Sequence, residues 1–190
     1  VKEALEDGIF IVAAAGNIDE EQNSSDVSSP ASIPGVIAVG AHGKSGDPWK
    51  DSATGSLTDP QTGENRTFPN QKPEITAPGI DLWSCIDSKR DPPYAFSTGT
   101  SDSTVIVTGA LALILAIHGE QIAGDDGKID EQEMRLVKVA LANSAKKTAD
   151  QVQIHDHKSG YGLLDAIEWS TQVQKEFGIG TETTDLPDAK

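Results

Sequence analysis

The sequence predicts an α/β domain in which a mostly parallel sheet is flanked by helices. Two continuous apolar runs, residues 9–15 and 36–41, are typical of parallel strands that are buried on both faces. Residues 101–118 and 130–142 have the apolar spacing and the capping residues of helices. Because strands and helices interleave along 190 residues, the chain suits one layered domain and not two.

The first part of the chain predicts a helix end followed by two strands. Residues 1–7 have the pattern of last helical turns, and Gly8 is the residue type that ends helices in a left-handed conformation. The run 9–15 then predicts a central strand, which stops at Gly16-Asn17. A polar loop separates this strand from the second buried strand.

The middle of the chain predicts a long excursion and several short strands. Residues 43–72 contain many Gly, Pro, Asp, Ser and Thr residues and few large apolar ones, which is typical of an irregular, functional or mobile loop. The turn pair Pro78-Gly79 interrupts the pattern that follows. We therefore expect short strands at residues 74–77, 80–84 and 94–97.

The second half of the chain is predicted to be mainly helical. A long helix covers residues 101–118, and its middle, 109–117, is apolar all round, so we expect it to be buried on all sides. Two later helices are expected at residues 130–142 and from 163 to about 173. We assign residues 1–178 to one folded domain and residues 179–190 to an acidic flexible tail.

The composition excludes several classes of protein. There are 30 acidic and 15 basic residues, and the net charge of −15 repels nucleic-acid backbones and anionic membranes. No apolar run approaches the roughly 20 residues that span a bilayer. The single cysteine, Cys85, excludes an internal disulfide framework and is expected to be a small buried group. The excess of carboxylates fits an extracellular, secreted or high-salt setting, where it keeps a protein soluble.

A serine lies at the predicted start of the long helix, in the motif Gly99-Thr100-Ser101. Free backbone N–H groups and the helix dipole favour negative charge there, so an oxyanion forming beside Ser101 would be stabilised. The alternative is that Ser101 is only a helix cap. Because Ser103 stands where Gly-x-Ser-x-Gly requires glycine, the motif does not predict an α/β-hydrolase.

An asparagine ends the first predicted strand. Asn17 therefore lies at the carboxyl edge of the sheet, which is where open α/β sheets bind ligands. Its side-chain amide can donate a hydrogen bond to a developing oxyanion. The alternative is an asparagine that only tolerates a left-handed turn.

Five segments occur in one order and spacing, from about residue 8 to residue 173: Ala13 to Asn17, residues 36–41, residues 72–79, Gly99-Thr100-Ser101 and Gly160-Tyr161-Gly162. Together they resemble the C-terminal half of a subtilisin-like serine protease, or subtilase. The resemblance implies a subtilase-like α/β fold that is incomplete on its N-terminal side, because a whole subtilase domain has about 250–300 residues. In an isolated piece we expect an exposed sheet edge, a swapped partner or a rearrangement.

The resemblance implies roles for the matched residues. Ser101 matches the nucleophile that forms an acyl-enzyme, and Asn17 matches the side-chain donor of the oxyanion hole, with the Ser101 N–H as the second donor. The resemblance also implies substrate-binding roles. The strand residues Ala13, Ala14, Ala15 and Gly16 would border the pocket for the substrate residue before the scissile bond, and Gly99 and Thr100 would lie beside the nucleophile.

The resemblance also implies catalytic residues that are absent from this sequence. In subtilases the triad follows the order Asp, His, Ser, so the Asp and the His lie upstream of Asn17. No histidine precedes Asn17, and none of the four present matches the catalytic one: His42, His118, His155 and His157. We therefore expect the Asp and His to come from the remaining N-terminal part of the protease domain, and the isolated chain to be inactive.

The function predicted for the complete protein is serine endopeptidase activity on polypeptide substrates, with no required cofactor. The family usually continues Gly-Thr-Ser-Met-Ala-x-Pro-His, whereas here Asp102 replaces an apolar residue, and Val105 and Ile106 replace Pro and His. A buried carboxylate beside the nucleophile opposes an oxyanion, although the helix dipole favours it. The alternative is a non-catalytic subtilase-like module used in binding or assembly.

Several polar segments invite a metal-binding interpretation. Residues 124–133 resemble the second half of an EF-hand loop, but side-chain oxygens are lacking at the first ligand positions, so a polar turn before a capped helix is favoured. His155 and His157 lack a third ligand, and the acidic loop 19–26 is favoured as a solvated loop. No metal site is predicted. Structural calcium is compatible with the resemblance, but its ligands cannot be matched.

Overall fold

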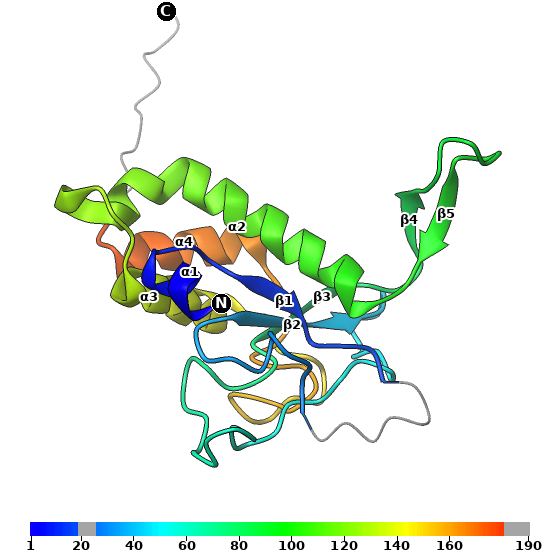
Figure 1. Cartoon of the computed structure of the whole chain (residues 1–190), viewed down its shortest axis with the longest axis horizontal. Helices are drawn as coiled ribbons and strands as arrows, with labels where there is room; N and C mark the ends of the chain where they lie inside the picture. The colour runs from blue at the N-terminus through cyan, green and yellow to red at the C-terminus, as the bar shows by residue number, and fades with distance from the viewer. Residues whose placement is uncertain (19–25, 181–190) are drawn as a thin grey trace, which may run out of the picture.

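The structure is a computed structural model that describes residues 1–18 and 26–180 (Figure 1). Its main sheet contains three parallel strands in the order β1-β2-β3: β1 (Val12–Ala14), β2 (Ile37–His42) and β3 (Ile75–Pro78). Val12 pairs with Ile37 in the first ladder, and Val39 pairs with Ile75 in the second. The predicted α/β fold with a parallel sheet is thus confirmed.

The central strand of this sheet is β2, so the prediction that the first strand is central is wrong. Within the described residues, β1 is hydrogen-bonded to a strand on one side only, and its other side is an edge. The strand is also shorter than the apolar run 9–15, and Ile9 at the start of that run is exposed. An open edge is one of the three features expected of an incomplete sheet.

The side chains around β2 divide between the two faces of the sheet, because successive residues of a strand point to opposite faces. Ile37 and Val39 belong to a cluster that includes the helices, whereas Val36 and Ala38 pack with Ala13 of β1 and with Ala15, which follows that strand. All four side chains are fully buried. The continuous apolar run therefore predicted correctly that both faces of this strand are covered.

Three helices contribute to the core on the first face: α2 (Thr100–Ala123), α3 (Glu131–Ser144) and α4 (Ala166–Glu176). Helix α2 contacts all three strands, and α3 packs against α4. The buried Trp169 of α4 donates its ring N–H to the Val137 carbonyl of α3 at 3.1 Å, which joins the two helices. The remaining helices are short: α1 (Lys2–Glu6) and the 3₁₀ helix η1 (Gly124–Asp126).

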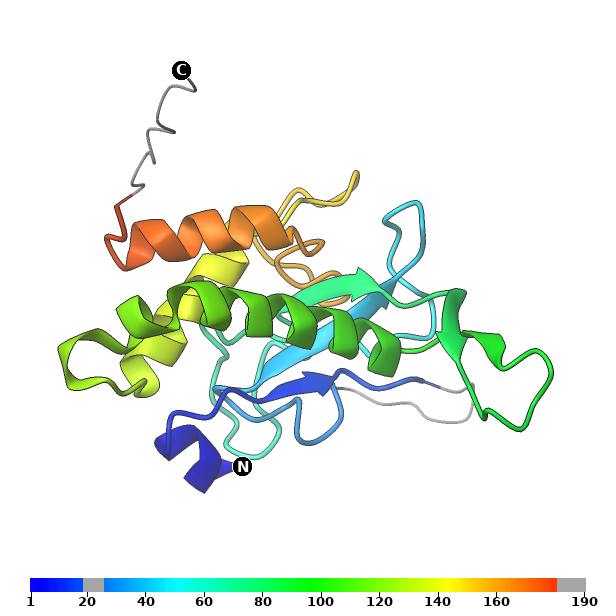
Figure 2. The ribbon, with the colours of Figure 1, turned by 90° about the horizontal axis from the view of Figure 1, so that it is seen from above.

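One side of α2 is exposed, so the prediction that this helix is buried on all sides is wrong. Val105, Leu113 and Ile117 are 70%, 67% and 63% exposed, and we call them the open face of α2. Figure 2 shows α4 along one flank of α2 and β1 along the other. By length and composition alone, α2 with η1 could cross a membrane, but its packing on the sheet is that of a core helix.

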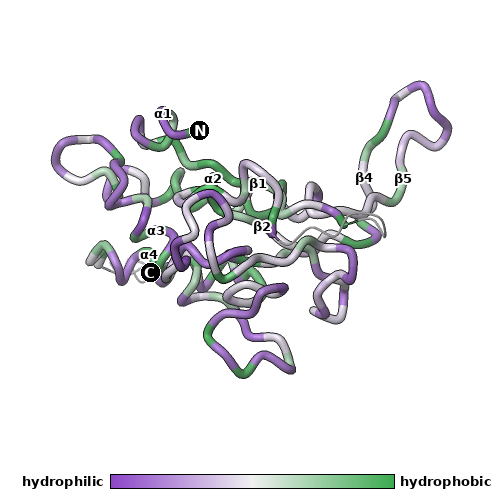
Figure 3. The backbone as a smooth tube through the Cα atoms, turned by 60° about the horizontal axis from the view of Figure 1, so that its bottom comes forward, coloured by the Kyte–Doolittle hydropathy of each residue, from purple (hydrophilic) through white to green (hydrophobic). Residues whose placement is uncertain are grey.

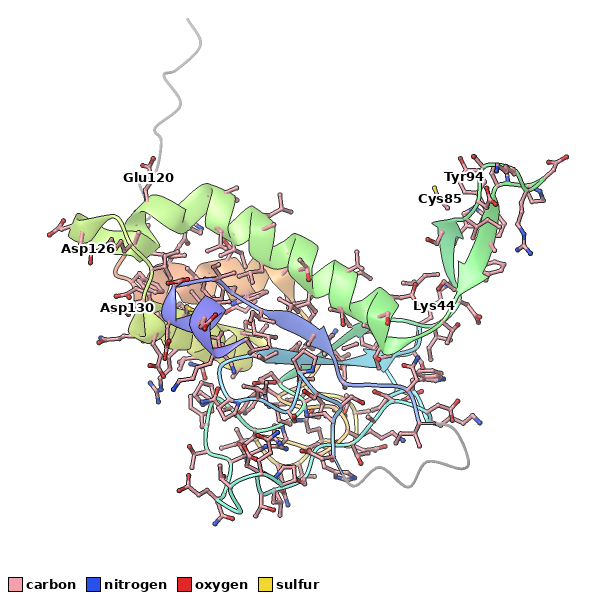
Figure 4. The ribbon with its side chains drawn as sticks, viewed as in Figure 1. Lys44, Cys85, Tyr94, Glu120, Asp126 and Asp130 are labelled. Carbon is pink, nitrogen blue, oxygen red and sulfur yellow. The ribbon has the colours of Figure 1, made fainter. Side chains whose placement is uncertain are left out.

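Two further strands form an antiparallel ribbon, β4 (Leu82–Cys85) with β5 (Tyr94–Ser97), that stands out from the body (Figure 1). Trp83 and Phe96 pair across it with ring centroids 4.8 Å apart, and both are largely exposed. Cys85 is exposed too, so the expectation of a buried cysteine is wrong (Figure 4). A two-stranded ribbon has no second layer that could cover its faces.

A cluster of buried charges holds the start of β2 against β3 and α3. Glu74 Oε1 accepts hydrogen bonds from Lys72 Nζ at 2.9 Å and from Lys138 Nζ at 2.7 Å, and its Oε2 accepts one from the Ala38 N–H at 2.8 Å. Both lysines also donate to the Val36 carbonyl. Burial lowers the pKa of Lys72 to about 8, although the nearby Glu74 carboxylate counteracts this.

The long segment 43–72 is irregular, as predicted, and its bridges are isolated ones such as Thr58 to Asn65. Figure 3 shows that hydrophilic residues predominate along the connecting loops, whereas hydrophobic residues follow β1 and α2. The predicted tail, except for residues 179–180, lies outside the described residues, and so does most of the acidic loop 19–26. The assignment of the tail therefore stays a prediction.

Candidate active site

Ser101 lies in the first turn of α2, and its side chain is exposed. The N-cap of this helix is Gly99, which has no side chain with which to cap it. Ser101 is therefore not the helix cap that the simpler interpretation required. The first N–H groups of a helix have no partner within it, so the Ser101 N–H is available at the positive end of the helix dipole.

The side chain of Asn17 is held beside this helix end by Thr100. The Thr100 N–H donates to Asn17 Oδ1 at 3.0 Å, and Thr100 Oγ1 donates to the same oxygen at 2.8 Å. The threonine hydroxyl in turn accepts a hydrogen bond from the Gly16 N–H at 3.2 Å. Because the amide oxygen of Asn17 is engaged twice, its Nδ2 is left as a donor on the side of Gly99.

Two glycines allow the segments of the site to approach one another. Gly16 has φ +113°, and a Cβ there would lie 2.4 Å from Ser28 Oγ, so only glycine suits the turn that presents Asn17. A Cβ on Gly79 would lie 2.1 Å from Ser103 Oγ. Ser103 itself donates to the Ala77 carbonyl at 2.9 Å, which fixes the first turn of α2 on the end of β3.

The alanines of β1 differ in what their side chains contact. Ala13 and Ala15 are buried in the cluster on the face of the sheet that holds Val36 and Ala38. Ala14 and Gly16 are only half-buried. The substrate-binding role of these residues stays a prediction.

Asp102 follows Ser101 and is half-buried. Its Oδ2 accepts a hydrogen bond from Ser97 Oγ at 3.0 Å, so the carboxylate leans toward the last residue of β5. In the part of the chain that the structure describes, no basic side chain lies within ion-pair distance of it. Among the described residues, the site therefore contains a carboxylate without a neighbouring cation.

The four histidines are engaged elsewhere. His42 Nδ1 donates to the Gly43 carbonyl at 2.7 Å, His118 contacts Ser170 Oγ at 3.0 Å, and His155 Nε2 donates to the Pro73 carbonyl at 2.9 Å. Burial lowers the pKa of His155, although the Pro73 carbonyl favours its charged form. His157 is exposed near Asp156. None of the four is hydrogen-bonded to Ser101 within the described residues.

The segments considered as metal sites have other roles. Asp130 accepts hydrogen bonds from the Gln132 and Glu133 N–H groups, and Glu133 Oε2 accepts one from the Asp130 N–H, so the capped start of α3 is confirmed. Asp26 forms a buried bidentate pair with Arg66 at 2.6 Å. Burial raises the pKa of Asp26, but the hydrogen bonds that its carboxylate accepts outweigh burial, so the pKa lies below its ordinary value. No group of three potential ligands is close enough to hold a metal among the described residues.

The comparisons with sequences of known proteins identify the family of the chain. The chain matches the subtilase family over residues 1–162. It is 36% identical to subtilisin amylosacchariticus of Bacillus subtilis subsp. amylosacchariticus over 118 residues, which are 62% of this chain and 26% of that protein. It is 30% identical to the major intracellular serine protease of Bacillus subtilis (strain 168) over 151 residues, which are 78% and 41%. The chain thus spans about a quarter to two fifths of these relatives' length.

Solved structures show the same fold. The prenylagaramide maturation protease PagA superposes with a TM-score of 0.65 and 25% identity over 90% of this chain and 53% of that one. The patellamide maturation protease PatG superposes with a TM-score of 0.66 and 23% identity over 90% and 46%, which supports the fold alone. The order of the motifs, the parallel sheet and the family match lead to the same conclusion: this chain belongs to the subtilase family of subtilisin-like serine proteases.

Proposed function

We propose that this chain is the nucleophile-bearing part of a serine endopeptidase that cleaves peptide bonds through an acyl-enzyme at Ser101. Membership of the subtilase family supports a serine peptidase in general terms. The observation that carries the proposal is the double hydrogen bond from Thr100 to Asn17, which leaves the Asn17 amide as a donor beside Gly99, at the start of the helix that holds Ser101. Two preorganised donors at a helix N-terminus are the arrangement that an acyl-transfer oxyanion requires.

The reaction follows from these positions. Ser101 Oγ attacks the carbonyl carbon of the scissile bond, and its proton passes to a histidine of the remaining N-terminal part, which the upstream aspartate orients. The carbonyl oxygen becomes an oxyanion that accepts hydrogen bonds from Asn17 Nδ2 and the Ser101 N–H. The C–N bond then breaks, and the amine leaves with the proton from the histidine. Water adds to the acyl carbon and releases Ser101.

Two open surfaces support the proposal that a further part of the fold completes the site. The edge of β1 has backbone groups that a further strand could pair with. The open face of α2 exposes three large apolar side chains in one row along the helix that begins at the nucleophile. An added strand and helix would cover both surfaces, and the segment that supplies them could also bring the catalytic Asp and His.

A serine-directed fluorophosphonate probe tests the proposal on the complete protein. We expect the probe to label Ser101, and we expect Ser101→Ala to abolish labelling while the protein stays folded. The isolated chain is expected to react only when the N-terminal part is added. A well-folded complete protein that takes up no label would overturn the proposal.

The second candidate is a non-catalytic subtilase-like module for binding or assembly. It is favoured by the altered motif after Ser101, in which Asp102 places a carboxylate beside the site of the oxyanion. Such a module would fold and bind polypeptides without reacting with the probe. Labelling therefore separates the two candidates, and a peptide-binding measurement on the unlabelled protein would support the second.

The setting of the protein is also a proposal. The net charge of −15 favours an extracellular or secreted protein, whereas the relative named an intracellular protease suggests the alternative. Detection of the protein in culture medium or in the cell fraction decides between them. Acyl transfer by this machinery needs no cofactor. A structural calcium ion would be revealed by a melting temperature that falls on addition of a chelator.

A further inference from the structure

The carboxylate of Asp102 lies very near the donor that would stabilise the oxyanion. Asn17 Nδ2 and Asp102 Oδ2 lie 3.3 and 3.5 Å from the one point where a Cβ on Gly99 would stand. Because residue 99 is a glycine, no side chain fills that space. A peptide bound across Gly99 would therefore meet an amide donor and a carboxylate within about 7 Å of each other.

The position of Asp102 assigns the carboxylate to one side of the scissile bond. It accepts its hydrogen bond from Ser97, at the end of β5, and so faces the base of the ribbon formed by β4 and β5. On the proposed function, the strand from Ala13 to Gly16 borders the pocket for the residue before the scissile bond. On that basis we assign the leaving group to the ribbon side of Gly99, toward which the Asp102 carboxylate leans.

We propose that Asp102 is a specificity-determining residue that makes the enzyme prefer lysine or arginine directly after the scissile bond. This inference rests on the proposed endopeptidase function. A half-buried carboxylate without a basic neighbour in the described residues attracts a cationic side chain, and partial burial weakens the screening by water and salt. The net charge of −15 also raises the rate at which cationic peptides arrive.

Peptides that differ only in the residue after the scissile bond test this inference on the complete protein. With Lys, Arg, Met or Glu at that position, we expect kcat/KM to be about tenfold higher for Lys and Arg than for Met, and lowest for Glu. Asp102→Asn should remove most of the ratio between Lys and Met. Asp102→Lys should reverse it in favour of Glu.

Glu120→Gln is the matched control, because it removes the same unit of charge from the same helix. Figure 4 shows Glu120 at the end of α2 opposite the nucleophile, and 18 residues of helix separate the two positions by about 27 Å. We expect this variant to keep the ratio between Lys and Met. If Glu120→Gln changes the ratio as much as Asp102→Asn does, net charge and not Asp102 sets the preference, and the inference is wrong.

Two further outcomes would overturn the inference while leaving the endopeptidase function intact. One is an Asp102→Asn variant that cleaves all four peptides faster by the same factor, because the carboxylate would then only oppose the oxyanion. The other is a preference for a cation before, and not after, the scissile bond.

A binding measurement keeps the inference testable even if the protein does not cleave. Fluorescence anisotropy of the same peptides with the Ser101→Ala protein should show tighter binding of Lys and Arg peptides, and the difference should fall at high salt. Lack of probe labelling together with this binding preference would overturn the endopeptidase function alone. Equal affinities for the Lys, Met and Glu peptides would overturn the role of Asp102.

Discussion

Thr100 donates two hydrogen bonds to the side-chain oxygen of Asn17, one from its N–H at 3.0 Å and one from its hydroxyl at 2.8 Å. An asparagine amide that is held through its oxygen can only offer its NH2 group to other partners. The residue before the proposed nucleophile therefore sets which way the proposed oxyanion donor points. Thr100 acts through Asn17 and is a positioning residue.

Thr100→Val should reduce kcat of the complete protein by about tenfold with little change in KM, because the amide of Asn17 loses one of two restraints. The variant should also lose about 1 kcal/mol of stability, since Thr100 is buried. Thr100→Ser keeps the hydroxyl and should restore most of kcat. An unchanged kcat in Thr100→Val would show that the backbone N–H alone orients the amide.

If Asn17 is the oxyanion donor, Asn17→Ala should reduce kcat by about 10²–10³, which is the range known for such an asparagine in subtilisin itself. The loss should appear in kcat and not in KM, because the hydrogen bond strengthens only as the oxyanion forms. Steady-state kinetics on a neutral peptide measures it. A change in KM alone would instead make Asn17 a ground-state binding residue.

Leu111→Ala and Leu113→Ala compare the two sides of α2. Leu111 is 4% exposed and Leu113 is 67% exposed, so in the isolated chain the first variant should lose about 2–5 kcal/mol of unfolding free energy and the second less than about 0.5 kcal/mol. Urea denaturation followed by circular dichroism gives both values. In the complete protein, Leu113→Ala should become costly as well, if an added helix covers the open face of α2.

Glu74→Gln should destabilise the fold by about 3–5 kcal/mol, because Lys72 and Lys138 would be left buried without their counter-ion. The control is Glu6→Gln, which breaks the exposed pair with Lys2 and should have no measurable effect on stability. Thermal denaturation compares the two variants at equal ionic strength. Similar melting temperatures for both would mean that water reaches the lysines.

Acidification should destabilise the protein partly through His155. Burial holds the pKa of this imidazole below its ordinary value of 6.5 in the folded state. Just below pH 6.5 the unfolded chain therefore binds more protons than the folded one, so stability falls as the pH falls through this interval. His155→Gln should flatten the dependence, whereas the exposed His157→Gln should not. Equal slopes in the two variants would assign the dependence to other groups.

The local pattern of residue types was enough to predict which segments form strands and helices, but it was less reliable in predicting which side chains are buried. The run 36–41 contains a strand buried on both faces, and the pairing of Asp130 with Glu133 caps α3 as expected. The apolar segment 109–117 is a helix, yet Leu113 and Ile117 are exposed. Hydropathy reports which side chains are apolar, but burial depends on whether another layer lies over them.

By itself, the sequence determined where the main strands and the long helix lie along the chain, and it pointed to Ser101 and Asn17 as the candidate nucleophile and oxyanion donor. Only the tertiary structure decided that Thr100, 83 positions from Asn17, holds the amide of that residue, and that Asp102 leans toward Ser97. It also decided that Cys85 is exposed on a projecting ribbon. The physical reason is that residue types and spacing reflect local propensities, whereas these contacts exist only once distant segments pack together.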